Sequence, residues 1–193
     1  IEHIYLEKPV SNNFNDIQTI VTNYPNANIF VGFDMHYDVG LQKVKSLIEE
    51  KIIGNIVSVN AQVGQYLPDW RPYEDYSKGM SAKKETGGGV MLDLVHEFDY
   101  LYWLFGNANT IAAMYKNSGS LKIETEDIAE VLLHFENGIL GTIHLDYLQQ
   151  KLVRNCLITG NEGSIKWDLV QSKVSWILKD KLEYEFSYTG FER

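Results

Sequence analysis

The segment DIAEVLLHFENGILGTIHLDY, residues 127–147, decides the fold of this chain. Apolar and polar residues alternate on both sides of Asn137-Gly138. An Asn-Gly pair between two alternating runs is a strong signal of a tight β-hairpin. The segment therefore predicts two antiparallel strands, over residues 127–135 and 139–147.

The same period of two continues through the back half of the chain. Further turns are expected at residues 161–163 and 179–181, where the alternation is interrupted by Asn-Glu-Gly and Lys-Asp-Lys. Because short turns join antiparallel neighbours, we expect one large antiparallel sheet in meander order. Its other strands are predicted near residues 108–116, 152–159, 163–169, 173–178 and 182–188.

The front half of the chain has a different pattern. A strand over His3–Leu6, a helix over residues 14–23 capped by Ser11 or Asn12, and a strand over residues 28–33 predict a βαβ unit. This unit is too small to be a whole nucleotide-binding domain. Helices over residues 39–52 and 90–105 flank a strand over residues 56–63. The predicted class is α+β: a large, mostly antiparallel sheet with helices packed on one face, preceded by the βαβ unit.

Composition limits the classes of function. The chain has 193 residues, 45% of them hydrophobic and 22% charged, which is enough to bury a core. A net charge of −9 without any Lys/Arg cluster argues against a nucleic-acid partner. No apolar run approaches the ~18–20 residues of a membrane helix. The single cysteine, Cys156, excludes an intrachain disulfide and fits a reducing, cytoplasmic compartment.

The segment Gly87-Gly88-Gly89 runs directly into the helix predicted over residues 90–105. This helix carries Asp93 and His96, which lie on one face at a spacing of three. An imidazole titrates near neutral pH, so His96 is a candidate acid/base group, oriented by Asp93 behind a glycine hinge. The structural alternative is that Asp93 favours the positive helix end and His96 is a hydrogen-bonded core residue.

Lys8 lies in Glu7-Lys8-Pro9, directly after the first predicted strand. Ligands of open α/β sheets bind beyond the carboxyl ends of strands, so Lys8 could polarise a reacting hydroxyl. The alternative is a solvated lysine in a turn. In the long loop over residues 65–86, Trp70 and Arg71 could stack on and bind a sugar or a carboxylate. Alternatively, Trp70 only pins this loop to the core.

A metal site is a weaker interpretation. It would use Asp93, His96, Glu97 and Asp99, with His36 as a further ligand. Asp99 lies too far around the helix to join Asp93 and His96, and no second His/Cys group has ligand spacing. We therefore expect no metal.

Taken together, these motifs resemble the Gfo/Idh/MocA oxidoreductase family. The resemblance rests on residues 7–9, 31–33, 53–56 and 87–99, with weaker matches at the hairpins over residues 135–138 and 160–165. It implies an NAD(P)-dependent dehydrogenase that transfers hydride to or from a sugar or sugar derivative. The loop over residues 67–76 is similar to a sugar-processing subgroup of bacterial surface-polysaccharide pathways.

The resemblance also implies roles for residues. His96 matches the family's acid/base histidine, Asp93 the helix aspartate that supports it, and Lys8 the lysine that contacts substrate near the nicotinamide. In much of the family the aspartate precedes the histidine by four residues, whereas here the gap is three; one residue turns a helical side chain by about 100°. Cofactor contacts are expected from Glu7, Lys8 and Pro9, and substrate contacts from Lys8, Trp70, Arg71, Tyr76, Asp93 and His96.

Two domains follow from the same resemblance. Residues 1–34 would end a Rossmann dinucleotide-binding domain, and residues 35–193 would form a substrate-binding and oligomerisation domain, truncated at its C-terminus. No Gly-x-Gly-x-x-Gly occurs in the sequence. The main NAD or NADP site is therefore expected upstream, and this fragment alone is expected to be inactive.

The expected partners are a sugar-like substrate and further copies of the chain. A homodimer or homotetramer would form through the sheet face, on which His144, Tyr147 and Trp176 are predicted to lie. The alternative function is a non-catalytic module for sheet-mediated dimerisation or sugar binding.

Overall fold

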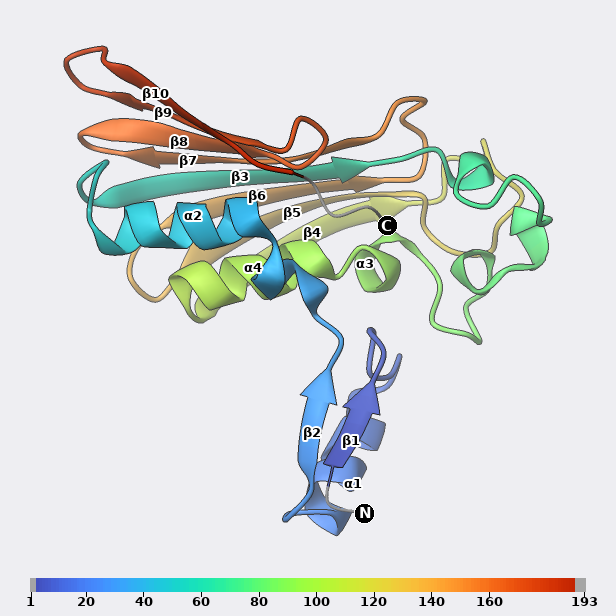
Figure 1. The fold of residues 1–193 in the computed structure, drawn as a ribbon. Helices are drawn as coiled ribbons and strands as arrows, with labels where there is room; N and C mark the ends of the chain where they lie inside the picture. The colour runs from blue at the N-terminus through green and yellow to red at the C-terminus, as the bar shows by residue number, and fades with distance from the viewer. Residues whose placement is uncertain (1–2, 190–193) are drawn as a thin grey trace.

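The computed structural model describes residues 3–189, and its largest element is an eight-stranded mixed sheet (Figure 1). The β3–β6 pair is parallel and the other neighbouring pairs are antiparallel, which confirms the mostly antiparallel sheet. The spatial order is β10 (Glu183–Ser187), β9 (Lys173–Leu178), β8 (Gly163–Asp168), β7 (Val153–Gly160), β3 (Ile56–Gly64), β6 (Leu140–Asp146), β5 (Ile128–Phe135) and β4 (Ala108–Lys116).

The predicted meander order is wrong at one place, because β3 lies between β6 and β7. Ser58 of β3 pairs with Leu140 on one side and with Thr159 on the other. The inward side chains of β3, such as Val59 and Val63, are buried, as expected for a central strand. Period-two alternation predicts a strand and its faces but not its neighbours, so this insertion has no signal in the pattern.

The hairpin predicted at Asn137-Gly138 is present and joins β5 to β6. Gly138 has φ 85°, a left-handed conformation that glycine adopts without strain. The opening segment therefore forms the two strands that its pattern predicts.

Helices α2 (Val39–Glu49) and α4 (His96–Phe105) cover one face of the sheet (Figure 1). Asp38 caps α2 by accepting a hydrogen bond from Leu41 N at 2.8 Å, and it also accepts from Trp167 Nε1 of β8 at 3.0 Å. The cap therefore fastens the start of α2 to the sheet, close to the cavity described below.

The single helix predicted over residues 90–105 is in fact two. A short helix, α3 (Val90–Asp93), is separated from α4 by a turn at Leu94 and Val95. The backbone carbonyl of Asp93 accepts a hydrogen bond from Lys8 Nζ at 2.6 Å. In a continuous helix that carbonyl would accept from residue 97, so the contact with Lys8 accompanies the break. The break also removes the shared helix face on which the Asp93–His96 prediction relied.

The glycine triplet is packed against the preceding loop. Gly87, Gly88 and Gly89 are buried, and the last two donate backbone hydrogen bonds to residues 83 and 81 of the preceding loop. A Cβ on Gly88 would lie 2.5 Å from the Met80 carbonyl oxygen. Glycine is required here because the loop and the start of α3 approach so closely.

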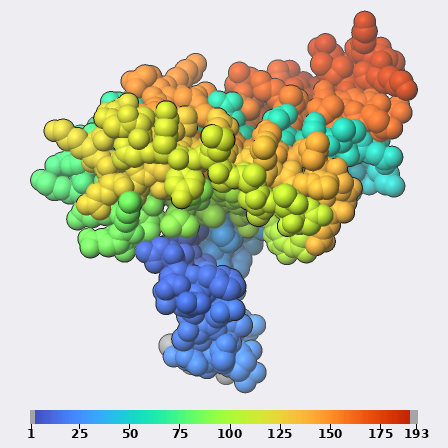
Figure 2. Space-filling model, turned by 180° about the vertical axis from the view of Figure 1, so that it is seen from behind, coloured from blue at the N-terminus to red at the C-terminus, as the bar shows by residue number. Residues whose placement is uncertain are grey.

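A βαβ unit forms the N-terminal part, as predicted. Its strands β1 (His3–Leu6) and β2 (Asn28–Val31) are parallel, and α1 (Phe14–Asn23) connects them. The cap of α1 is Asn13, not Ser11 or Asn12. The unit projects from the helix-bearing side of the sheet as a narrow stalk (Figures 1 and 2). A 3₁₀ turn, η1 (Asp34–Tyr37), joins it to the larger body.

Within residues 3–189, no helix covers the second face of the sheet (Figure 1). Three side chains were predicted to lie on this face, and His144 is the one that does. Tyr147 is fully buried on the inner side, and Trp176 faces inward with Lys43 of α2 5.5 Å from its ring centroid. The alternation predicts two opposite faces for β9 but not which of them the helices cover.

His144 titrates between two carboxylates on this open face. Its hydrogen bonds to Asp146 at 2.9 Å and, against the effect of partial burial, to Glu130 at 2.5 Å raise its pKa from 6.5 to about 9. A group whose pKa is higher in the folded state stabilises the protein. This stabilisation is complete below the unfolded-state pKa and is lost as the pH rises through the folded-state pKa. We therefore expect His144→Gln to cost more stability at pH 6 than at about pH 10. Urea unfolding of both proteins across this range measures the difference, and a gap independent of pH would contradict the ion pairs.

Candidate active site

Lys8 and Asp93 bring the βαβ unit and the sheet domain into contact. Lys8 follows β1, and its Nζ lies 3.4 Å from Asp93 Oδ1 in addition to its bond to the Asp93 carbonyl. The Lys8 side chain is 21% exposed and that of Asp93 is 7% exposed. An ammonium and a carboxylate from segments 85 residues apart thus meet at the junction of the two parts, where a ligand could still reach Lys8.

The second carboxylate oxygen of Asp93 is held by two hydroxyls. Ser81 Oγ donates to Asp93 Oδ2 at 2.5 Å, and Tyr147 OH donates to the same atom at 3.0 Å. Burial, followed by the negative charge of Asp93, raises the pKa of Tyr147, so the phenol stays protonated and remains a donor. Donors from three separate segments therefore fix the position of Asp93.

His96 begins α4 and is nearly buried. Its Nε2 lies 3.6 Å from Asp34 Oδ1 of η1, and the ring of Phe33 packs edge-on against it. The carboxylate of Asp34 thus lies beside His96, whereas the carboxylate of Asp93 faces Lys8, Ser81 and Tyr147. Sequence reasoning missed Asp34, although an acidic residue just beyond the end of β2 was a usable signal.

A second contact of the same kind links η1 to α4. His36 Nε2 lies 2.8 Å from Asp99 Oδ2, and the His36 ring stacks on Trp103. Burial raises the pKa of Asp99, and His36 opposes this shift. The segment that connects the two parts of the chain is therefore attached to α4 at two points.

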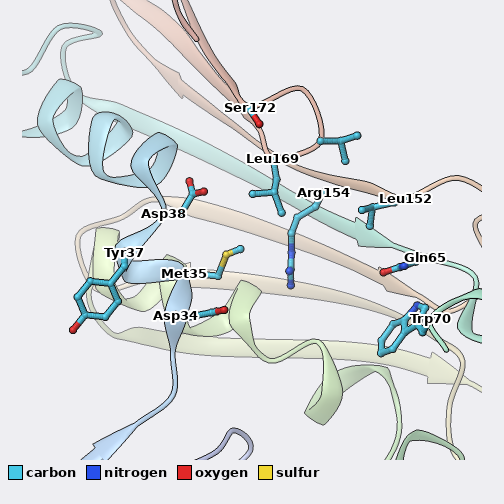
Figure 3. A pocket seen from close by; sticks show the side chains of 11 residues that line it. Asp34, Met35, Tyr37, Asp38, Gln65, Trp70, Leu152, Arg154, Leu169 and Ser172 are labelled. Carbon is cyan, nitrogen blue, oxygen red and sulfur yellow. The ribbon is translucent and has the colours of Figure 1, made fainter. Parts of the chain in front are cut away.

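A cavity of about 860 Å³ opens beside Asp34 (Figure 3). Its wall includes Trp70, Gln65 and Arg154, together with apolar side chains such as Leu152 and Leu169. Mostly apolar walls with a few polar groups are typical of small-molecule sites. Asp34 belongs to this wall and also contacts His96, so the cavity adjoins the candidate acid/base group.

Arg154, on β7, is a second charged residue that sequence reasoning missed. Its Nε and Nη2 donate to the two carboxylate oxygens of Glu97 at 2.7 and 2.9 Å, and both residues are buried. Burial lowers the pKa of Arg154, but Glu97 outweighs this effect and the pKa is raised. Its position along the strand could have indicated this, because Arg154 alternates with Cys156 and Ile158 on the buried face of β7. A buried arginine needs a buried partner.

The loop residues predicted to bind substrate lie in different places. Trp70 lines the cavity and packs edge-on against Tyr147 with ring centroids 5.4 Å apart. Arg71 is exposed and lies 4.0 Å from Glu74, while the Tyr76 hydroxyl accepts from the Lys122 backbone at 3.3 Å. The structure therefore brings Trp70, but neither Arg71 nor Tyr76, to the cavity wall.

Within residues 3–189, no three His, Cys, Asp or Glu side chains are grouped so that they could hold a metal ion. In the same part of the chain, no helix has the length and apolar character needed to cross a membrane.

The family is established by sequence comparison. The model of the GFO/IDH/MocA C-terminal domain matches residues 41–166. This chain belongs to the GFO/IDH/MocA family. The family match covers β3, α3, α4 and most of the large sheet, and it contains Asp93, His96, Glu97 and Arg154.

Relatives in the family include named oxidoreductases. Oxidoreductase P35 of Formosa agariphila is 27% identical over 99% of this chain and 59% of its own length. Myo-inositol 2-dehydrogenase of Thermotoga maritima is 27% identical over 74% of this chain and 42% of its own length. The chain thus spans about half the length of the curated relatives it matches.

Solved family structures share the fold. The WlbA dehydrogenase of Bordetella pertussis, crystallised with NADH and UDP-GlcNAcA, superposes with a TM-score of 0.75 and 26% identity over 85% of this chain and 50% of its own. Other solved structures of this fold were crystallised with NAD+ or NADH.

Proposed function

We propose that the protein containing this chain is an NAD(P)-dependent dehydrogenase that acts on a sugar or sugar derivative. In this proposal, residues 1–34 end the dinucleotide-binding domain and residues 35–193 form the substrate domain. One observation carries the proposal: Lys8, from the end of β1, contacts Asp93 of the sheet domain beside the start of α4, where His96 lies. The named dehydrogenases among the relatives support the reaction class.

The residues present fit the nicotinamide end of such a cofactor. Glu7 and Lys8 follow β1, and Gly32 follows the parallel strand β2, so these residues lie at the sheet edge where α/β proteins bind dinucleotides. A Cβ on Gly32 would lie 2.5 Å from the Tyr5 hydroxyl, so a larger residue here would require the Tyr5 side chain to move. Glu7, Lys8 and Pro9 would contact the cofactor.

Each of the protein groups has a role in this proposal, as the family resemblance implies. A nicotinamide bound at this edge would supply or accept the hydride at the substrate carbon. In the oxidation direction His96 takes the hydroxyl proton, and in the reduction direction it returns the proton. The Lys8 ammonium stabilises negative charge on the reacting oxygen, and Asp93, fixed by Ser81 and Tyr147, orients Lys8.

The substrate is proposed to enter the cavity beside Asp34, with Trp70 as an aromatic wall. The surface-polysaccharide connection rested on the loop over residues 67–76. Trp70 of this loop lines the cavity. The loop therefore supports a sugar substrate and does not indicate a particular pathway. Reduction of NAD+ or NADP+ by a panel of sugars and cyclitols tests the function, and no turnover with any of them would contradict it.

Loss of the Lys8 ammonium should impair the reaction strongly. We expect Lys8→Met to lower kcat/KM by roughly 10²–10³-fold, the usual effect of removing one group that stabilises developing charge. Steady-state kinetics with the preferred sugar measure this effect, with the exposed Lys84→Met as the matched control. A change of less than about threefold would exclude Lys8 from the reacting site.

We also propose that the chain assembles through the open face of its sheet, as a homodimer or homotetramer. Exposed apolar side chains gather on this face from neighbouring strands, namely Met114, Leu132, Leu140, Leu157 and Ile177. Apolar surface of this kind is typical of a protein interface.

Disrupting this face should separate the subunits. We expect Leu132→Asp to convert the assembly to monomers in sedimentation velocity, because a charge would be buried at the interface. Tyr102→Asp, on the exposed side of α4, is the matched control. A wild-type protein that is already monomeric would contradict the interface.

The second candidate function is a non-catalytic module for dimerisation or sugar binding. Turnover of any sugar would exclude it.

A further inference from the structure

The turn η1 is attached to the first turns of α4 by two contacts between an aspartate and a histidine. Asp34 of η1 faces His96, and two residues later His36 faces Asp99. His96 and Asp99 are three residues apart on α4, so they lie on one face of the helix. The His36 ring also stacks on Trp103. The His36–Asp99 contact therefore helps to hold Asp34 in place beside His96.

The contact between Asp34 and His96 acts through charge. Asp34 Oδ1 lies 3.6 Å from His96 Nε2, which is longer than a hydrogen bond but within the range of an ion pair. A protonated imidazole carries hydrogen on both ring nitrogens, so Nε2 then presents an N–H to this carboxylate. His96 is only 6% exposed, and burial disfavours its charged form unless an opposite charge is near. Asp34 therefore favours His96 in the form that has taken up a proton.

The other charged groups on the elements around His96 are paired with each other. They form the pairs Lys8–Asp93, Glu97–Arg154 and His36–Asp99. Because each pair brings opposite charges together, its net effect on a neighbouring group is small. In the part of the chain that the structure describes, the carboxylate that faces the imidazole is that of Asp34.

We propose that Asp34 is a positioning residue for His96, and that its carboxylate stabilises the imidazolium that forms when His96 takes the proton of the reacting hydroxyl. This inference rests on the proposed function, because it concerns the acid/base group of the same site. In the oxidation direction the substrate O–H bond breaks, its proton forms an N–H bond on His96, and the hydride passes from the carbon to the nicotinamide cofactor. Asp34 balances the new charge on His96 and keeps its own charge.

This role differs from the one that the family resemblance implies for Asp93. The Asp93 carboxylate accepts hydrogen bonds from two hydroxyls and lies 3.4 Å from Lys8 Nζ, so its charge is already engaged. The turn between α3 and α4 also separates Asp93 from the helix face that carries His96. In this arrangement Asp93 acts on Lys8, and Asp34 acts on His96.

The titration of His96 tests this assignment without any need for turnover. The ¹⁵N signals of the imidazole are followed by NMR against pH in the complete protein that contains this chain, and the His96 signals are assigned with His96→Gln. We expect Asp34→Asn to lower the midpoint of the His96 titration by roughly 0.5–1 pH unit, because the imidazolium loses its neighbouring negative charge. The shift is at the small end of the usual range because the Asp34 side chain is 61% exposed and therefore partly screened.

Three further variants interpret this shift. Asp34→Glu keeps the carboxylate, so the His96 midpoint should stay close to the wild-type value. Asp180→Asn, in the exposed turn between β9 and β10, is the matched control and should also leave it in place. Asp93→Asn should move it less than Asp34→Asn does. An unmoved midpoint in Asp34→Asn, or a larger shift in Asp93→Asn, would overturn the proposal.

The pH dependence of the reaction separates a charge effect from a structural one. In the oxidation direction kcat/KM should rise with pH as His96 loses its proton. We expect Asp34→Asn to move this rise to lower pH by the same amount, and Asp34→Glu to restore it. A loss of kcat/KM that is equal at every pH would indicate a structural role and overturn the inference. A His96 midpoint that follows Asp34 in a protein that turns over no sugar would support the charge contact and contradict the proposed function, whereas turnover with an unmoved midpoint would do the reverse.

Discussion

Replacing His96 with alanine is expected to lower kcat at least ~100-fold, the usual scale for loss of a general acid/base. His96 lies at the start of α4, nearly buried, with its Nε2 3.6 Å from Asp34 Oδ1 at the edge of the cavity. Without the imidazole, the hydroxyl proton has no positioned acceptor in the oxidation direction. The loss should appear mainly in kcat, because the proton moves only in the chemical step.

The control for this experiment is His134→Ala, which removes an exposed histidine from the open face of the sheet. Stability of both variants is measured by urea unfolding, so that a folding defect is not mistaken for a catalytic one. An unchanged rate for His96→Ala would remove His96 from the mechanism. A rate loss that appears equally in His134→Ala would point to a general effect on the fold.

Removing Glu97 is expected to lower the free energy of unfolding by about 3–5 kcal/mol, because Glu97→Ala leaves the buried Arg154 guanidinium without its counter-charge. Both residues of the pair are buried, and two hydrogen bonds of 2.7 and 2.9 Å join them. The pair also connects the start of α4 to β7. We therefore expect this variant to disturb the position of His96 as well.

Urea unfolding measures this change, and two further variants interpret it. Glu185→Ala removes an exposed partner of Lys173 on the edge strands and should leave the stability nearly unchanged, because exposed ion pairs contribute little. The double variant Glu97→Met with Arg154→Met removes both charges, and it should recover much of the stability lost in Glu97→Ala. A cost below about 1 kcal/mol for Glu97→Ala would show that the buried charge is compensated elsewhere.

The local elements of the fold could be predicted from the sequence. The alternation and the Asn137-Gly138 turn correctly gave β5 and β6, and the other strands of the back half are close to their predicted ranges. The βαβ unit was also predicted correctly. These features are encoded by residues a few positions apart, so they can be read along the chain.

The candidate site could be predicted only in part from the sequence. Lys8, Trp70, Asp93 and His96 were identified by residue type and by resemblance, and the structure places them near the junction or the cavity. The pairing of Asp93 with His96 was predicted from a continuous helix. The turn at Leu94 separates the two, and Lys8 contacts Asp93 instead.

The sequence by itself determined the strands, the turns, the βαβ unit and the residue types available for chemistry. Only the tertiary structure decided that β3 enters the sheet between β6 and β7, that Asp34 lies beside His96, and that Glu97 binds Arg154. The physical reason is the distance along the chain over which each kind of signal acts. Periodicity and turn chemistry act between near neighbours, whereas Glu97 and Arg154 are 57 residues apart and meet only because α4 packs on the inner face of β7.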